Sequence, residues 1–211
     1  EGIPLGRVVG VLAPVSGELD NTVAAPARPR TDATGRAGVE VQGAGDPLGE
    51  LRGAGGVDRA GGGAGGATRS DSVRAGLAAV PDDATIICVH EAARPCADAA
   101  LFDRAVAAVV AGADGAIPAI AVTDTIKVVD GGVVVATPDR ASLVAVQTPQ
   151  AFRAEVLRRA HTTADTSTDD AALVEAIGGR VVVVEGDTRN RKITHPDDLE
   201  WARRQLETSR P

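Results

Sequence analysis

After residue 66, short apolar runs alternate with amphipathic segments, and this alternation predicts the order of strands and helices. Apolar runs of strand length are typical of strands buried on both faces of a sheet, and they span 84–90, 115–122 and 180–187. Segments with apolar residues at helical spacing span 98–112, 151–163, 169–179 and 195–207. Strands that alternate with helices predict an α/β layered fold with a mostly parallel sheet, formed by a single domain over residues 1–211.

A hairpin interrupts this alternation at 125–137, where two strand-like runs flank Asp130-Gly131-Gly132. A turn rich in aspartate and glycine between two apolar runs is a strong hairpin signal. Upstream, 65–77 predicts a helix that begins after glycines, and 7–17 begins as a buried strand that runs into a loop.

Residues 24–66 have a different composition, with 13 of the chain's 25 glycines and no aromatic residue. Such a segment buries too little apolar area to offset its ordering entropy easily. We interpret it as a divergent or poorly ordered segment, either a long loop or a degraded strand–helix–strand unit. A stretch of gene read out of frame would produce the same bias toward glycine, alanine, arginine and proline.

The composition predicts a globular protein with an aliphatic core, because 44% of the residues are hydrophobic and only 1% are aromatic. A net charge of −7 argues against a general nucleic-acid-binding protein. Cys88 and Cys96 make no disulfide framework, and Cys88, inside an apolar run, is predicted to be a core residue rather than a nucleophile. No run is long enough to span a membrane and no secretory leader is present, so we expect a cytoplasmic protein.

The stretch VHEAARP, from Val89 to Pro95, places Glu91 and Arg94 directly after the strand predicted at 84–90. In open α/β sheets, ligands bind beyond the carboxyl ends of the strands. Arginine presents a planar fork to phosphate oxygens, and a carboxylate binds hydroxyls or a metal ion. Two interpretations fit these residues: they line a crevice for a phosphorylated hydroxyl compound, or they form a surface ion pair at a strand end.

Three other segments carry residues suited to binding phosphate. Arg69 and Ser72 follow glycines at the start of a helix, which is an anion-friendly arrangement, although Asp71 also fits an ordinary helix cap. Thr168 is the predicted N-cap of the helix at 169–179. Lys192 lies in a short apolar, strand-like context, where either a phosphate partner or a snorkelling side chain would accommodate its charge.

In their order and approximate spacing, these segments resemble the 2-C-methyl-D-erythritol 4-phosphate cytidylyltransferase family of the non-mevalonate isoprenoid pathway. The matching blocks run from about Gly65 to Leu206 and read GGxxRxxSVxxGL, VHxAARP, DTIK, DR, QTPQxF, TDDAxLVE and KIT-PDDL. The resemblance implies a Rossmann-like nucleotidyltransferase fold and a reaction that forms a CDP-sugar alcohol and pyrophosphate from CTP with a divalent cation, Mg²⁺. It assigns no metal ligand, and it leaves ribitol 5-phosphate open as an alternative sugar-alcohol substrate.

By this resemblance, two groups of residues match binding positions of the family. The nucleotide site is matched by Ala13, Ser16, Gly17, Gly66, Arg69, Ser72, Glu91 and Ala92. The sugar-phosphate site is matched by Glu91, Arg94, Thr125, Arg140, Thr148, Thr168 and Lys192. The resemblance gives Arg94, Arg140 and Lys192 the catalytic role of offsetting phosphate charge during transfer, and Glu91 stands where the family has an aspartate.

The resemblance also concerns the hairpin. In the family this hairpin, residues 125–140 here, is a dimer arm that reaches the neighbouring subunit and delivers the arginine matched by Arg140. The resemblance therefore implies a homodimer in which each site receives one cation from the other subunit.

The N-terminal loop departs from the family pattern, because Val15 replaces a glycine, Leu19 replaces an arginine and Ala27 replaces a lysine. Two interpretations stay open. Either the chain is an active transferase in which Arg28 or Arg30 substitutes for the lost lysine, or it is a catalytically impaired homologue that binds ligands and dimerises.

Overall fold

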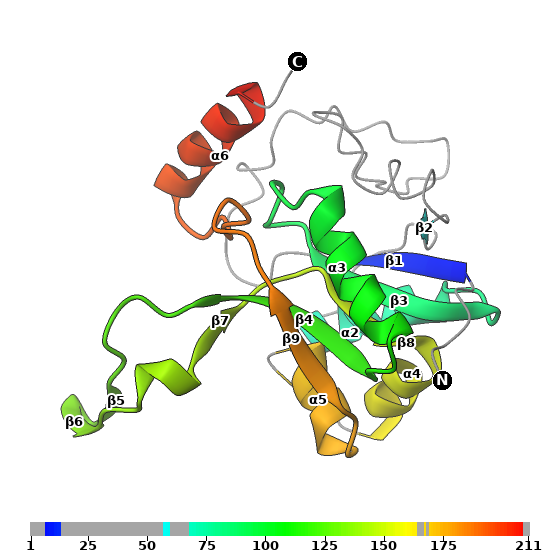
Figure 1. Ribbon diagram of the computed structural model, residues 1–211, viewed down its shortest axis with the longest axis horizontal. Coiled ribbons are helices and arrows are strands. Elements are labelled where there is room, and N and C mark those ends of the chain that lie inside the picture. Colours follow the sequence, from blue (N-terminus) through cyan, green and yellow to red (C-terminus); the bar gives the residue numbers. More distant parts are fainter. Residues whose placement is uncertain (1–6, 14–56, 60–67, 164–166, 168, 209–211) are drawn as a thin grey trace.

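The computed structural model describes residues 7–13, 57–59, 68–163, 167 and 169–208 (Figure 1). Its main sheet has seven strands, in the order β2-β1-β3-β8-β4-β7 with β9 also paired to β4. The strands are β1 (Arg7–Ala13), β2 (Val57–Arg59), β3 (Ala84–Glu91), β4 (Gly115–Ala121), β7 (Val144–Val146), β8 (Gln150–Arg153) and β9 (Val181–Glu185). The strands predicted at 84–90, 115–122 and 180–187 are therefore confirmed as β3, β4 and β9.

The α/β class and the mostly parallel sheet are both confirmed, because β1, β2, β3, β4 and β9 run in one direction and only the short β7 and β8 of this sheet run the other way. β1 runs parallel to β2 and β3, and β4 runs parallel to β9. β8, in contrast, is antiparallel to both β3 and β4, and β7 is antiparallel to β4. The chain leaves β4 through the hairpin and returns along the same strand, so the two short returning strands run in the opposite direction.

The helices are α2 (Arg69–Ala78), α3 (Ala99–Val110), α4 (Ala154–Thr163), α5 (Asp170–Ala176) and α6 (Pro196–Thr208). Helix α3 covers one face of the sheet, while α2, α4 and α5 cover the other (Figure 1). Apolar side chains of α3, including Leu101 and Phe102, form one buried cluster with the sheet, and those of α2, α4 and α5 form the second. The two buried clusters consist mainly of Val, Ile, Leu and Ala, as the composition predicts. The helix predicted at 151–163 begins later than expected, because its first residues form β8.

Two helix starts differ from the sequence expectation. Thr68 caps α2 and Asp71 is the third helical residue, so the two form a reciprocal capping box in place of an Asp71 cap. Asp169 caps α5, with its side chain accepting a hydrogen bond from the Ala172 backbone N–H at 2.8 Å. Thr168, the expected cap, lies outside the described residues. In both cases a nearby polar residue is the cap: Thr68 lies three residues before Asp71, and Asp169 directly follows Thr168.

The hairpin is confirmed as a two-stranded arm of β5 (Val128–Asp130) and β6 (Val133–Ala136), which projects from the main sheet (Figure 1). Gly131 and Gly132 have φ values of 53° and 84°, a left-handed backbone that glycine adopts without strain. A short 3-10 helix, η2 (Arg140–Ser142), leads from the arm into β7. The valines of the arm are strongly exposed, from 45% at Val128 to 66% at Val133.

The structure also bears on the predictions for Cys88 and for membrane spans. Cys88 is fully buried, and burial raises the pKa of its thiol to about 12, which confirms a core residue rather than a nucleophile. Within the described ranges, no helix is both long enough and apolar enough to cross a membrane.

Candidate functional site

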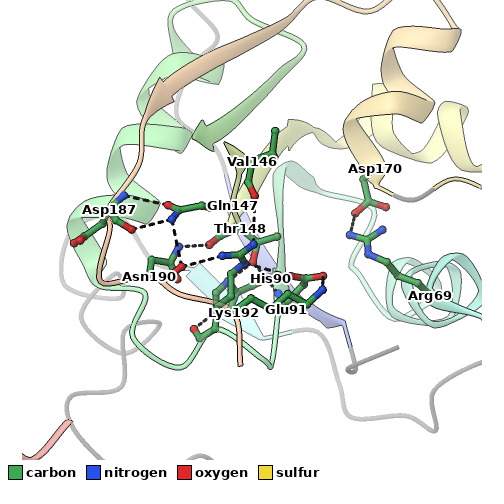
Figure 2. A network of polar contacts seen from close by, with 11 residues as sticks. Arg69, His90, Glu91, Val146, Gln147, Thr148, Asp170, Asp187, Asn190 and Lys192 are labelled. Carbon is green, nitrogen blue, oxygen red and sulfur yellow. Dashed lines mark hydrogen bonds and ion pairs between the residues drawn. The ribbon is translucent and has the colours of Figure 1, made fainter. Parts of the chain in front are cut away.

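A pocket of about 180 Å³ lies where β3 ends, next to the beginning of β8 and the first residues of α2. Its wall is formed by Arg69, Glu91, Arg94, Val146, Gln147, Thr148, Gln150, Asp169 and Lys192. These residues come from segments far apart in the sequence, and the carboxyl end of β3 brings them together (Figure 2). This is the place where an open α/β sheet is expected to bind a ligand.

An ion-pair cluster forms one wall of the pocket. Glu91 accepts from Lys192 Nζ at 2.9 Å and from Arg94 Nε at 3.3 Å, so each of its carboxylate oxygens faces a cation (Figure 2). Burial alone would raise the pKa of Glu91, but the lysine and the arginine outweigh it and hold the pKa below its ordinary value. Glu91 and Arg94 therefore form an ion pair and also line a pocket, so each of the two interpretations of the sequence, a ligand crevice and an ion pair at a strand end, is correct in part.

Arg94 also ties three segments of the chain together. Its guanidinium donates to the carbonyl oxygen of Asn190 at 2.9 Å and to that of Val146 at 3.3 Å, in addition to Glu91. The Asn190 side chain in turn donates to the Thr148 carbonyl at 2.7 Å. Arg94 is only 12% exposed, so it acts as a clamp that fixes the pocket wall, and Lys192, at 36% exposed, presents the more accessible charge.

A chain of hydrogen bonds through His90 fixes the end of β3. The Nε2 atom of His90 lies 3.1 Å from the Arg94 carbonyl, which only accepts, so Nε2 carries the proton. The Nδ1 atom then accepts from the Thr148 hydroxyl at 3.0 Å, and that hydroxyl oxygen accepts from the Glu91 backbone N–H at 3.0 Å. Burial lowers the pKa of His90 to about 4, which keeps the ring neutral and the chain of donors and acceptors intact at neutral pH.

This arrangement predicts a pH dependence of stability. The unfolded chain protonates His90 near its ordinary pKa of about 6.5, whereas the folded protein does so only near pH 4, so stability falls as the pH drops through this window. On lowering the pH from 7 to 5, we expect the free energy of unfolding to fall by about 2 kcal/mol more in the wild type than in His90→Gln, which cannot titrate. Urea unfolding at both pH values measures the difference, and an equal loss in the two proteins would contradict it.

A second charged group lies on the α2 side of the pocket. Asp170, at the first turn of α5, is fully buried and accepts from Arg69 Nη2 at 2.6 Å and from His161 Nε2 at 2.9 Å. Burial by itself would raise the pKa of Asp170, but the hydrogen bonds from His161 and Arg69 outweigh it and lower the pKa. The carboxylate thereby holds the Arg69 guanidinium at the edge of the pocket (Figure 2).

The structure brings together part of the residue set predicted from the sequence. Arg69, Glu91, Arg94, Thr148 and Lys192 all line the pocket. Ser72 does not line it, because it is buried and its hydroxyl donates to the Thr68 carbonyl at 3.0 Å.

The other predicted site residues lie elsewhere. Ala92 occupies an exposed turn after β3, and Ala13 is in register with Glu91 at the end of β1. Thr125 and Arg140 belong to the arm and are exposed, with Arg140 donating to the Thr123 carbonyl at 2.6 Å. Ser16, Gly17, Gly66 and Thr168 lie outside the described residues, as do Val15, Leu19, Ala27, Arg28 and Arg30.

Several polar residues of the site are not apparent from the sequence pattern. Gln147 donates to the Asp187 carbonyl at 2.8 Å and accepts from the Asp187 backbone N–H at 3.0 Å, which fastens the segment after β9 to the pocket. Gln150, Asp169 and Asp170 also belong to the site or support it. They belong to the segments QTPQ and TDD, whose resemblance to the family pattern, and no periodicity, marks them in the sequence.

Comparison with known proteins identifies relatives of most of the chain. The family model described as 2-C-methyl-D-erythritol 4-phosphate cytidylyltransferase matches residues 62–208. A protein of that description from Rhodococcus jostii is 52% identical over 146 residues, which are 68% of this chain and 64% of the relative. A bifunctional enzyme IspD/IspF from Oleidesulfovibrio alaskensis is 51% identical over 140 residues, which are 64% of this chain but only 35% of the relative.

Solved structures show the same relationship. The 2-C-methyl-D-erythritol 4-phosphate cytidylyltransferase from Thermus thermophilus has a TM-score of 0.62 and 35% identity, over 72% of this chain and 74% of that one. A 4-diphosphocytidyl-2C-methyl-D-erythritol synthase has a TM-score of 0.63 and 36% identity, over 75% of this chain and 76% of that one.

Proposed function

Because the chain belongs to the 2-C-methyl-D-erythritol 4-phosphate cytidylyltransferase family, we propose that it transfers the cytidylyl group of CTP to 2-C-methyl-D-erythritol 4-phosphate and releases pyrophosphate. The chain spans 35% and 64% of the length of the proteins from Oleidesulfovibrio alaskensis and Rhodococcus jostii that it matches, so the activity of the whole protein is a proposal for this chain. The transfer joins the sugar phosphate to the α-phosphorus and leaves little covalent chemistry for the protein, so positioning and charge stabilisation carry the catalysis.

The observation that carries the proposal is the set of charges around the pocket. Three cations, Arg69, Arg94 and Lys192, surround a space at the end of β3 in which Glu91 and Asp169 are the carboxylates. Lys192 is 36% exposed and anchored by Glu91, and its remaining donors would contact a phosphate oxygen. Arg69, which is held by Asp170 and is 11% exposed, adds positive charge at the edge of the pocket.

A divalent cation fits this proposal only in part. Within the described ranges, no group of three or more His, Cys, Asp or Glu residues is arranged to hold a metal ion. Mg²⁺ in phosphoryl-transfer sites commonly binds one or two carboxylates together with substrate phosphates and water. Glu91 and Asp169 are the carboxylates of the pocket that could contribute, and both already accept hydrogen bonds from the protein. The cation would offset the negative charge of the triphosphate.

Substrate binding and turnover test the proposal separately. Calorimetric titration with 2-C-methyl-D-erythritol 4-phosphate, and in parallel with ribitol 5-phosphate, measures whether the pocket takes the sugar phosphate and which one it prefers. Pyrophosphate release with CTP and Mg²⁺ then measures transfer. If the chain binds a sugar phosphate and Lys192→Ala weakens this binding, but no pyrophosphate is released, the chain is the impaired homologue. If the chain binds neither sugar phosphate, the proposal is contradicted.

We further propose that the protein acts as a homodimer through the arm of residues 125–140. A two-stranded hairpin is marginal in water unless another surface covers it, and Val129, Val133, Val134 and Val135 are each more than half exposed. Arg140, at the base of the arm, does not line the described pocket of its own subunit. An arm that crosses to a second copy would cover the valines and bring Arg140 to the other subunit's pocket.

Subunit complementation tests the crossing directly. Arg140→Ala and Lys192→Ala should each weaken sugar-phosphate binding by about ten- to hundredfold, since each removes a charge-assisted contact. If Arg140 acts on the other subunit, co-expression of the two variants should restore about a quarter of the sites, because half of the randomly paired dimers contain one intact site. Calorimetry gives the number of restored sites, and light scattering gives the mass. No restoration, or a monomer at micromolar concentration, would contradict the dimer.

A further inference from the structure

One polar side chain in the pocket wall has an atom without a partner. Gln150, the first residue of β8, is only 2% exposed and lines the pocket. Its side-chain oxygen Oε1 is buried and has no hydrogen-bond partner in the part of the chain that the structure describes. Buried polar atoms are nearly always paired, so an unpaired one in a binding pocket calls for an explanation.

The position of Gln150 in the sheet brings its side chain to the wall of the pocket. Gln150 is in register with Val89 of β3, so its side chain stands on the sheet face that α2, α4 and α5 cover. It shares the pocket wall with Arg69, from the first turn of α2, and with Asp169, the N-cap of α5. Among the described residues, the other buried side-chain atoms without a hydrogen-bond partner belong to residues outside the wall, namely Arg153, His161 and Asn190.

The chemistry around Gln150 narrows what it would bind. Arg69, Arg94 and Lys192 already provide positive charge for phosphate oxygens. An amide oxygen accepts hydrogen bonds and carries no net charge, so it can hold a hydroxyl without repelling a nearby phosphate as a carboxylate would. A phosphorylated polyol or a nucleotide offers such hydroxyl donors beside its phosphate.

We propose that Gln150 determines specificity by accepting a hydrogen bond from a hydroxyl of the bound substrate through its side-chain oxygen. This inference rests on the proposed function, which supplies two sources of hydroxyls, the sugar alcohol and the ribose of CTP. In the free protein the oxygen is left unpaired, and the substrate hydroxyl completes its hydrogen bonding. A substrate that lacks the hydroxyl would leave the oxygen buried and unpaired, which is a strong basis for discrimination.

The test uses Gln150→Met, which keeps an unbranched side chain of similar size and removes the acceptor, and Gln150→Leu as a second apolar variant. We expect each variant to bind the substrate that supplies the hydroxyl about tenfold more weakly. The variants should bind inorganic phosphate as the wild type does. Their urea midpoints should equal or exceed that of the wild type, because replacing an unpaired buried polar group by an apolar one is nearly neutral or stabilising.

Separate titrations identify the source of the hydroxyl. A loss confined to 2-C-methyl-D-erythritol 4-phosphate assigns it to the sugar alcohol, and a loss confined to CTP assigns it to the ribose. The role of Gln150 is overturned if both variants bind both ligands as tightly as the wild type does. It is also overturned if their weaker binding accompanies an equal loss of stability in both variants. If the wild type binds neither ligand, the proposed function itself has failed, and the inference falls with it.

Discussion

Restoring the family's residues in the N-terminal loop with Val15→Gly, Leu19→Arg and Ala27→Lys should raise the rate of pyrophosphate release by about 10²-fold or more. In the family pattern that the chain resembles, this loop holds a triphosphate, and glycine at the position of Val15 permits the close approach of backbone N–H groups to the phosphates. Leu19 and Ala27 supply no charge to offset the leaving pyrophosphate. Removing one transition-state donor of this kind typically costs about 2.7–4 kcal/mol, although such losses seldom add.

Steady-state rates with CTP, Mg²⁺ and the sugar phosphate measure this effect, and the wild type is expected to be very slow. Arg28→Ala and Arg30→Ala serve as controls, because either arginine could stand in for the missing lysine. The expectation of a slow wild type would be contradicted if the wild type turned over at an ordinary rate and one of the two arginine variants were much slower. A triple variant no faster than the wild type would contradict the expected gain in rate.

Asp170→Ala should be the most destabilising single change among the charged residues of the site, with a loss of about 3–5 kcal/mol. The carboxylate has no exposure to solvent and is shared by Arg69 and His161, so its removal leaves a largely buried guanidinium and a buried ring without their common acceptor. For a chain of this length, the melting temperature should fall by roughly 10 °C.

The neighbouring carboxylate provides a matched control for Asp170. Asp169→Ala removes only a helix cap, which typically costs about 1 kcal/mol. Because the pKa of Asp170 is lowered in the folded protein, its contribution is present above the unfolded pKa and is lost as the pH falls through the folded one. The gap between wild type and Asp170→Ala should therefore narrow in acid, measured by thermal melts. Equal losses in the two alanine variants at neutral pH would show that the buried pairing contributes little.

The strands that could be predicted from the sequence are those with long apolar runs. β3 and β4 are covered by helices, so nearly every position is apolar and the run itself identifies the strand. β7 and β8 have only three and four residues and lie next to polar site residues, so no periodicity marks them. The antiparallel direction of these two strands could not be predicted from the pattern.

Some residues of the candidate site could likewise be predicted from the sequence, and others could not. Glu91 and Arg94 could be predicted as site residues, because they directly follow an apolar run and such strand ends form binding crevices. Their partners could not, since Lys192 is 101 residues from Glu91 and Arg94 binds backbone carbonyls that carry no sequence signal. Asp170 illustrates the same limit, because an acid in the first turn of a helix is ordinary and only the fold brings Arg69 and His161 to it.

The exposed arm has a consequence for the newly made chain. β5 and β6 are rich in valine, and their outer edges pair with no other strand in the part of the chain that the structure describes. Such edges are a template for aggregation until another surface covers them. The ends of the arm carry residues that oppose such growth: Lys127 precedes β5, Asp130 ends it, and Pro138 follows β6 soon after its last residue. The residues that flank the valines would thus act as gatekeepers, protecting the chain from aggregation during synthesis and at low concentration.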